Sequence, residues 1–360
     1  MGNIIDYLRW RGDLTFAQSP FNNVDNLILS QLSYVNLDGI APGEGEEGIP
    51  IEELSDIFFQ KYSPEELKKD RSFLRRAPEI IKEMAKTVRY RDAVVKNFVN
   101  RIDEEKELQF AALEICLSDG TSYIAYRGTD DTIVGWKEDF NLSKGVILSE
   151  EAAVIYLDHF GELSRGQLRI GGHSKGGNLA VYAAAMCKTK VQEKILKVYD
   201  NDGPGFADNF LEQEGFLRMK SRVERLIPEG SIIGMLLDHA VEPRYIASSQ
   251  TGVRQHDGFT WQVLGPDFIY KKALNKRAAL FNETLDNWLH NLEEEERNAL
   301  ISDFFSVMEV TGASTLTELQ DGGLRNIRLM LRQIEQLNPE TRERVDELIK
   351  ALVSAWHKFI

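Results

Sequence analysis

Short apolar runs alternate with helix-like segments between residues 168 and 248, and this alternation constrains the fold more than any other feature of the chain. The expected strands are Leu168–Gly171, Ile195–Tyr199, Val223–Ile227 and Arg244–Ser248, and the expected helices are Gly177–Cys187 and one near Phe206. Strands separated by helices at this spacing imply crossover connections and a largely parallel sheet. The sequence therefore predicts an α/β fold, with a mostly parallel central sheet that carries helices on both faces.

The chain just before this alternation is predicted to contribute further strands. We expect them at Val94–Ile102, Leu108–Leu117 and Thr121–Tyr126, with Ser118–Gly120 as the hairpin turn between the last two. A helix is expected to begin at Ser149, because its hydroxyl can cap the first turn of the residues that follow.

Helical segments flank the strands on both sides. Ser63–Glu66 reads Ser-Pro-Glu-Glu, which combines an N-cap serine, a proline at the first helical position and a glutamate at the third. Past residue 270, apolar positions recur at helical spacing, for example from Leu324 to Ile334. We predict a helical N-terminal extension over residues 1–92 that acts as a cover, an α/β catalytic domain over 93–270 and a helical C-terminal extension over 271–360.

The net charge limits which partners the chain is expected to bind, and the cysteines indicate the cellular compartment. Against 43 lysines and arginines stand 57 aspartates and glutamates, so the 360 residues carry a formal net charge of −14, and we expect no nucleic-acid partner. Cys116 and Cys187 form no Cys-x-x-Cys pair and no cluster with histidine, which indicates a reducing compartment without structural zinc. Because the sequence has neither a signal-peptide pattern nor a bilayer-spanning stretch, we expect a cytoplasmic protein with no integral membrane segment. We expect no cofactor and no metal.

The segment 169–180 reads Arg-Ile-Gly-Gly-His-Ser-Lys-Gly-Gly-Asn-Leu-Ala and carries the strongest chemical signal. A bare Gly-x-Ser-x-Gly pattern is weak, but here it lies between an apolar strand and a helix rich in small residues, as a nucleophile elbow requires. Gly172 and Gly176 then provide the space that a strained serine turn needs. We predict Ser174 as a nucleophile, with the backbone N–H of Lys175 as one oxyanion donor. The alternative is an ordinary glycine-rich turn between a strand and a helix.

A serine nucleophile needs a base, and chain order narrows the choice of histidine. In chains with a nucleophile elbow of this kind, the serine is followed by the acid and then by the histidine, so His159 and His173 come too early. His290 and His357 are set aside because they lie in the predicted helical tail. Of the two that remain, His256 lies in the glycine-flanked loop 251–261 and is preferred to His239, which follows an apolar stretch.

The acid and the second oxyanion donor are assigned from turns that follow strands. Asp202 stands just beyond the strand that follows the elbow helix, and a carboxylate there could hold the imidazole tautomer. Ordinary turn chemistry before Gly-Pro is an equally good interpretation of Asp202. The alternative acids are Asp200, Glu229 and Asp238. Thr129 follows the strand that ends at Tyr126 and is the candidate second oxyanion donor.

Four motifs together resemble the class 3 lipase group of α/β-hydrolases: Tyr126–Thr129, residues 135–140, Gly172–Gly177 and the downstream His256. Other patterns are similar to an uncharacterised bacterial branch of that group, known mainly as a domain of unknown function. These patterns are Asn3–Tyr34, Asp202–Gly205, Gly234–Leu236 and Gln255–Asp257. The lipase resemblance covers roughly residues 93 to 265, and the resemblance to the uncharacterised branch covers nearly the whole chain.

This resemblance implies an α/β-hydrolase fold, with Ser174 as nucleophile, His256 as base, and Thr129 with the Lys175 N–H as oxyanion hole. Two departures stand out. Class 3 lipases usually have leucine where Lys175 stands, and their acid lies in a strand exit that corresponds here to Arg225–Ser231. Because Ser231 cannot act as that acid, either Asp202 has taken the role or the triad is incomplete.

The leading hypothesis is a serine hydrolase that cleaves a carboxylic ester through an acyl-enzyme, with a small-molecule or lipid ester as substrate. The acidic surface favours a soluble or neutral ester over phospholipid in an anionic bilayer. A thioesterase or a peptidase would use the same triad. A rival from another class is a non-catalytic binding or scaffold protein that keeps the hydrolase fold. The sequence carries no pattern that sets an oligomeric state.

Overall fold

A computed structural model describes most of the chain. The described residues are 1–69, 73–103, 105–130, 146–206, 209–275 and 322–336, with 310–313 and the single positions 278, 307, 318 and 342. The motif at 135–140, the two histidines His290 and His357 and most of the predicted C-terminal extension lie outside the described residues.

One large mixed sheet organises the described part of the molecule, where nine strands occur in the order β1-β2-β3-β4-β5-β6-β7-β8-β11. Their bounds are β1 (Ile49–Pro50), β2 (Val94–Asp103), β3 (Leu108–Cys116), β4 (Ser122–Tyr126), β5 (Leu168–His173), β6 (Ile195–Asn201), β7 (Val223–Pro228), β8 (Arg244–Ile246) and β11 (Tyr270–Lys271). Strands β4 to β8 are parallel, whereas β1 to β4 and the β8–β11 pair are antiparallel. A separate small hairpin joins β9 (Val263–Leu264) to β10 (Asp267–Phe268).

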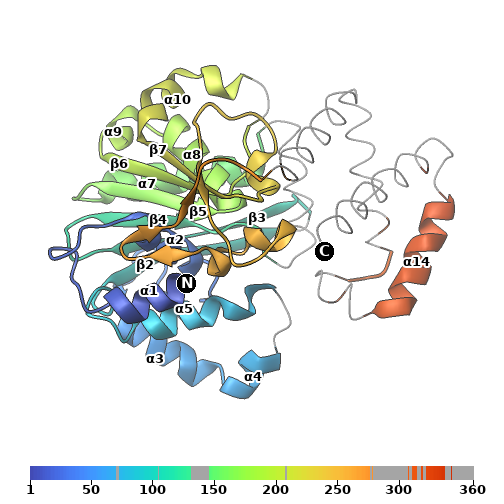
Figure 1. The fold of residues 1–360 in the computed structure, drawn as a ribbon, viewed down its shortest axis with the longest axis horizontal. Helices are drawn as coiled ribbons and strands as arrows, with labels where there is room; N and C mark the ends of the chain where they lie inside the picture. The colour runs from blue at the N-terminus through green and yellow to red at the C-terminus, as the bar shows by residue number, and fades with distance from the viewer. Residues whose placement is uncertain are drawn as a thin grey trace.

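Helices cover both faces of this sheet (Figure 1). The helices are α1 (Ile4–Arg11), α2 (Asn23–Leu32), α3 (Ile51–Lys61), α4 (Pro64–Lys69), α5 (Ala77–Met84), α7 (Leu148–Leu163), α8 (Lys175–Met186), α9 (Thr189–Gln192), α10 (Glu214–Met219) and α14 (Gly323–Gln336). In the view of Figure 1, α3 and α5 lie below the strands, and α9 and α10 lie above them.

The alternation of side chains along β4 explains the two layers. Tyr123 and Ala125 belong to the core formed with the N-terminal helices, while Ile124 and Tyr126 belong to the core formed with α7, α8 and α10. Successive strand side chains point to opposite faces, so a strand that is buried at every position, as β4 is, must be covered on both sides. The prediction of an α/β-hydrolase fold with helices on both faces is confirmed, with residues from the N-terminal segment forming one of the two cores. The sheet is mixed and not mostly parallel, because four of its eight strand pairs in the described residues are antiparallel. The division of the chain at residues 92 and 270 stays a prediction.

Two local predictions about helices are confirmed. The capping box at the start of α4 is present, because the Ser63 N–H donates to a Glu66 carboxylate oxygen at 2.8 Å and the Glu66 N–H donates to Ser63 Oγ at 3.3 Å. The helix predicted around Leu324 to Ile334 is α14. Cys116 and Cys187 are both free thiols. No helix within the described ranges combines the length and the apolar character that crossing a bilayer requires.

One local prediction is wrong, and a second is displaced along the chain. Ser149 does not cap a helix: α7 begins at Leu148, and its first turn is closed instead by the Ile147 N–H, which donates to the Glu150 carboxylate at 3.1 Å. Phe206 itself makes a backbone β-bridge with Asp238, and the helical structure expected near it begins later, with the 3-10 helix Phe210–Glu212. The next α-helix, α10, begins only at Glu214.

A buried ion pair joins the N-terminal helices to the chain that enters the sheet. Asp25 on α2 accepts two hydrogen bonds from the Arg89 guanidinium, at 2.8 and 2.5 Å, and both side chains are completely buried. The hydroxyls of Tyr7 on α1 and of Tyr90 donate to the same carboxylate. A charge in this position is costly unless its partner is present.

We therefore expect Asp25→Asn to lower the free energy of unfolding by about 3–5 kcal/mol, because it leaves the Arg89 charge buried without its counter-ion. Chemical denaturation measures this loss. The control is Asp92→Asn, which removes a pair with Arg91 in which both side chains are largely exposed, and it should change stability by less than about 1 kcal/mol. Equal effects of the two variants would contradict the structural role of the buried pair.

Candidate active site

Ser174 occupies a sharp turn between β5 and α8. The strand ends at His173, the helix begins at Lys175, and Ser174 between them has φ 58° and ψ −135°. A residue other than glycine takes these dihedral angles only when its surroundings enforce them. The Ser174 residue is partly exposed, while His173 and Lys175 beside it are buried. The turn thus presents the serine at the carboxyl edge of the parallel strands.

Glycines around this turn allow the backbone segments to touch. A Cβ on Gly172 would lie 2.3 Å from the carbonyl carbon and oxygen of Gly176, and one on Gly176 would lie 2.2 Å from the Tyr126 carbonyl oxygen. Real Cβ contacts are never this short, so only glycine fits at either position. Both glycines predicted from the Gly-x-Ser-x-Gly pattern therefore have a steric role at the turn.

Buried amides fix the turn from the side of the N-terminal helices. The Ser174 N–H donates to the Asn201 carbonyl oxygen at 2.9 Å, and the Asn201 side-chain amide donates to the Gly172 carbonyl oxygen at 2.8 Å. Asn26 on α2 donates in turn to the Asn201 side-chain oxygen at 2.7 Å. The N-terminal segment is thereby connected to the backbone that carries Ser174.

The structure brings together Asp202 and His256, which are 54 residues apart. His256 Nδ1 lies 2.7 Å from Asp202 Oδ2. The Asp202 side chain is completely buried, whereas about a quarter (26 %) of the His256 side chain is exposed. Asp202 follows β6 directly and has φ 57°, a conformation in the left-handed region. A carboxylate in this place fixes one tautomer of the imidazole and leaves the other ring nitrogen for proton transfer.

Ser174 lies next to this pair but is not hydrogen-bonded to it. Among the described residues, no hydrogen bond joins Ser174 Oγ to His256. The neighbouring His173 ring is 4.6 Å from the His256 ring, measured between centroids, so the two chain segments are in contact. Hydrogen bonds between a nucleophile and its base are often long in unliganded sites and shorten in the substrate complex.

His173 connects the turn to the segment that carries His256. Its Nε2 lies 2.7 Å from the His256 carbonyl oxygen, which can only accept, so Nε2 carries the proton. Burial lowers the pKa of His173 well below its usual value, and the ring is therefore neutral at neutral pH. The Tyr34 hydroxyl lies 3.2 Å from His173 Nδ1 and 3.0 Å from its carbonyl oxygen. Neither contact of His173 was expected from the sequence.

The loop after β4 lies against the same turn. A Cβ on Gly128 would lie 3.1 Å from Ser174 Cβ and 2.2 Å from the Tyr34 hydroxyl, so this loop passes directly beside the serine. Arg127 and Asp130 close the loop with an ion pair of 3.2 Å, and Thr129 between them is buried. Burial lowers the pKa of the Arg127 guanidinium.

Lys175 places its backbone and its side chain in different environments. Its backbone begins α8 directly behind Ser174, where the N–H groups of the first turn have no partner within the helix. Its side chain is buried, and Nζ donates to the Gln109 side-chain oxygen on β3 at 2.8 Å. The cationic head therefore extends toward Gln109, while the backbone N–H lies at the start of the helix.

The other candidate acids have different partners. Asp200 Oδ2 lies 3.7 Å from Arg225 Nε, and Glu229 pairs with Lys271 at 3.4 Å. Asp238 is exposed. Within the described residues, none of these three carboxylates contacts His256.

His239, the alternative base, has no activating partner in the described structure. Its buried Nε2 forms no hydrogen bond to a described residue. Burial lowers the pKa of its ring to about 3. Its surroundings therefore disfavour the protonated imidazolium that a general base must form during the reaction.

Ser231 contacts the Asp202–His256 pair, and Gln255, the residue before His256, binds the turn that carries Ser231. Ser231 Oγ lies 2.5 Å from Asp202 Oδ1, and the Gln255 side-chain oxygen accepts from the Gly230 N–H at 3.0 Å. The sequence excluded Ser231 as an acid but gave no signal that it would contact one.

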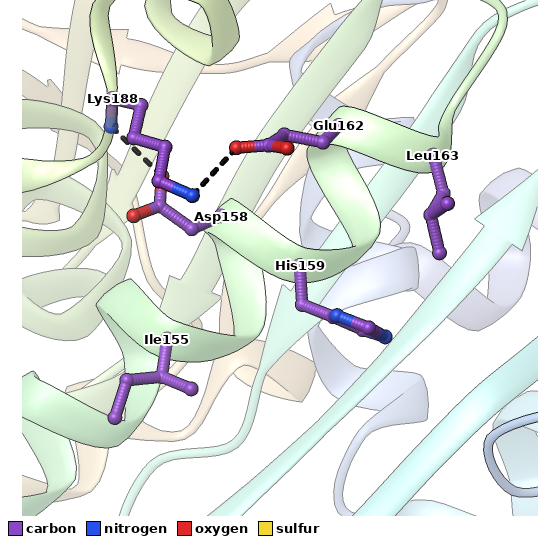
Figure 2. A pocket seen from close by; sticks show the side chains of 6 residues that line it. All are labelled: Ile155, Asp158, His159, Glu162, Leu163 and Lys188. Atoms are coloured by element: carbon purple, nitrogen blue, oxygen red, sulfur yellow. Dashed lines mark hydrogen bonds and ion pairs between the residues drawn. The ribbon is translucent and has the colours of Figure 1, made fainter.

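A pocket elsewhere on the surface lies over α7 and holds none of these residues (Figure 2). It is lined by Ile155, Asp158, His159, Glu162, Leu163 and Lys188. Charged residues of this pocket bind to each other: Lys188 Nζ forms an ion pair of 2.7 Å with Glu162, and the Lys188 backbone N–H donates to Asp158 at 2.8 Å.

Comparisons with known proteins give one family and partial likenesses to solved structures, among them two lipases. A family model described as Mbeg1-like matches residues 84–306, which is more than half of the chain. A Rhizomucor miehei lipase propeptide complex is 17 % identical with a TM-score of 0.30, and the alignment covers 43 % of this chain and 57 % of that one. A structure of M37 lipase is 18 % identical with a TM-score of 0.36, covering 58 % of this chain and 68 % of that one. The match thus spans less than two thirds of the Rhizomucor lipase chain. No curated protein sequence matches.

The buried Asp200 predicts a specific pH dependence of stability. Burial raises the pKa of Asp200 from 3.8 to about 7, against the opposing effect of Arg225. Between these pH values the folded protein keeps a proton on Asp200 that the unfolded chain has released. The contribution of Asp200 to the free energy of unfolding is therefore complete below about pH 4 and declines as the pH rises to about 7. We expect Asp200→Asn to remove that decline, which can reach about 1.4 kcal/mol per pH unit.

Denaturation of wild type and Asp200→Asn between pH 4 and 8 measures the effect. The difference between the two free energies of unfolding should move in favour of the variant as the pH rises. Other titrating groups, His173 and His239 among them, occur in both proteins and cancel in the difference. Two parallel stability curves would contradict the raised pKa of Asp200.

Proposed function

The chain belongs to the Mbeg1-like family, a lipase-like family, and from that premise we propose that it is a serine hydrolase that cleaves a carboxylic ester. In this proposal Ser174 Oγ attacks the ester carbonyl carbon while His256 Nε2 takes the hydroxyl proton. The tetrahedral intermediate collapses to an acyl-enzyme, and the proton passes from His256 to the departing alcohol. Water, activated by His256 in the same way, then releases the carboxylic acid and restores the Ser174 hydroxyl.

The remaining roles in this proposal follow from position. Asp202 holds His256 with Nδ1 protonated and stabilises the imidazolium that forms in each step. The Lys175 N–H at the start of α8 and Thr129 in the loop beside Ser174 stabilise the oxyanion, where a helix N-terminus is electrostatically favourable. The positive end of the helix dipole is useful here because negative charge develops on the carbonyl oxygen only during the reaction.

One observation supports the proposal most strongly. A buried carboxylate lies 2.7 Å from a partly exposed histidine, and the histidine segment contacts a strained serine turn. An ordinary strand-helix turn has no need of a serine at φ 58°, and the cost of such a conformation is typical of functional sites. The proposed substrate is a small-molecule or lipid ester without net negative charge, because a chain of charge −14 repels anions.

A fluorophosphonate probe tests the nucleophile. Its phosphorus forms a bond to an activated serine oxygen with loss of fluoride, so we expect labelling of the wild type and none of Ser174→Ala. His159→Ala is the matched control for His256→Ala, because His159 is an exposed histidine on α7 whose partner is Glu44. His159→Ala should label normally, and His256→Ala should label much more slowly. A folded wild-type protein that resists the probe would contradict the proposal and favour a binding or scaffold role.

Hydrolysis of short p-nitrophenyl esters tests the acid. Asp202→Asn should lower kcat by roughly 10³–10⁴-fold, because an amide beside Nδ1 favours the wrong imidazole tautomer. Glu229→Gln and Asp238→Asn should hydrolyse the ester at nearly the wild-type rate. Normal turnover by Asp202→Asn, or a comparable loss in either control, would assign the acid elsewhere. Matched thioester and amide substrates in the same assay distinguish an esterase from a thioesterase or a peptidase.

A further inference from the structure

Ser231 lies in the turn that follows β7 and is almost completely buried, at 2 % exposure. Its N–H donates to the Pro228 carbonyl oxygen at 2.9 Å, which shapes the turn. Its Oγ accepts a hydrogen bond from the Gly234 N–H at 3.0 Å and lies 2.5 Å from Asp202 Oδ1. An ionised carboxylate can only accept, so the hydroxyl proton of Ser231 is directed at Asp202.

Asp202 is therefore held through both of its carboxylate oxygens. Oδ1 accepts from Ser231 and Oδ2 faces His256 Nδ1. The backbone is fixed as well, since the Asp202 N–H donates to the Leu226 carbonyl oxygen at 2.8 Å. With both oxygens engaged, the plane of the carboxylate cannot rotate about the terminal side-chain bond without breaking one of these contacts.

The turn containing Ser231 also contacts the segment that carries His256. The Gly230 N–H donates to the Gln255 side-chain oxygen at 3.0 Å, one residue before His256. At Gly234 a Cβ would lie only 2.3 Å from Asp202 Oδ1, so the turn approaches the carboxylate as closely as a glycine allows. Adjacent residues of one turn thus contact the carboxylate on one side and the histidine segment on the other.

We propose that Ser231 is a positioning residue, which orients the Asp202 carboxylate toward His256 Nδ1 by donating its hydroxyl proton to Oδ1. The effect of Ser231 on catalysis rests on the proposed function, whereas its effect on the orientation of Asp202 does not. The buried hydroxyl does not touch substrate, and it acts through Asp202. A charge-assisted hydrogen bond of this kind is stronger than a neutral one, which suits it to hold a carboxylate in one orientation.

The experiment compares two buried serines that each donate to a buried carboxylate. Ser231→Ala removes the hydrogen bond to Asp202. Ser122, at the start of β4 and far from His256, donates to Glu114 at 2.7 Å, and Ser122→Ala removes that bond. We expect Ser231→Ala to lower kcat about tenfold with KM changed less than twofold, and Ser122→Ala to leave both nearly unchanged. Ser231→Cys keeps the shape with a weaker donor, and its kcat should lie between those of wild type and Ser231→Ala.

A spectroscopic readout separates positioning from general destabilisation. In proton NMR, the Nδ1 proton of His256 should resonate far downfield in wild type and in Ser122→Ala, because a carboxylate shares it. This resonance should move upfield in Ser231→Ala and by a smaller amount in Ser231→Cys. If Ser231→Ala does not fold, the shift in Ser231→Cys still tests the proposal.

Two outcomes would overturn the proposal, and a third separates it from the proposed function. An unchanged His256 resonance in folded Ser231→Ala and Ser231→Cys would overturn it, and so would a kcat loss of equal size in Ser122→Ala. A wild type that shows the downfield resonance but hydrolyses no ester would refute the proposed function alone, because the resonance still measures whether Ser231 positions Asp202.

Discussion

The close approach of Gly172 to Gly176 is the contact on which the rest of the site depends. It lets β5 turn into α8 within one residue, so that Ser174 takes φ 58° and stands partly exposed above the sheet. Substitution at either glycine would place a Cβ within 2.3 Å of backbone atoms. Three neighbouring segments hold Ser174 in this strained conformation. They are the backbone of β6 at Asn201, the loop after β4 at Gly128, and the start of α8 with the positive end of its dipole.

The N-terminal segment belongs to this arrangement as much as the strands do. Its helices form one of the two cores of the sheet, and Asn26 and Tyr34 reach the elbow backbone and the His173 ring. The Asp25–Arg89 pair anchors α2, which carries Asn26, to the residues that lead into β2. A segment predicted as a cover therefore also contributes to the position of the candidate nucleophile. We infer that loosening these helices would disturb Ser174 without any change to the residues around it.

The strands and the turn at Ser174 could be predicted from the sequence, whereas contacts between side chains far apart in the sequence could not, for a physical reason. Strand alternation and the Gly-x-Ser-x-Gly context are local patterns, so the central parallel strands and the turn at Ser174 could be predicted. His256 is preferred to His239 because it lies in a glycine-flanked loop, and the structure places it against Asp202, one of four acids left open. Ser231 and Tyr34 contact the site through side chains 29 and 139 residues away in sequence, and nothing in their neighbourhood signals such pairing. The helix start at Ser149 failed because Glu150 satisfies the first turn from inside the helix.

The central claim is that Ser174 carries the acyl group of an ester during turnover. The most direct measurement is mass spectrometry of the wild-type protein quenched with acid while it hydrolyses a p-nitrophenyl ester, followed by digestion and mapping of the acyl group. We expect one acyl group per chain on the peptide that contains Ser174, and we expect it to disappear once the substrate is exhausted. Turnover with no acyl group on that peptide, or with the acyl group on another residue, would contradict the role of Ser174 as nucleophile.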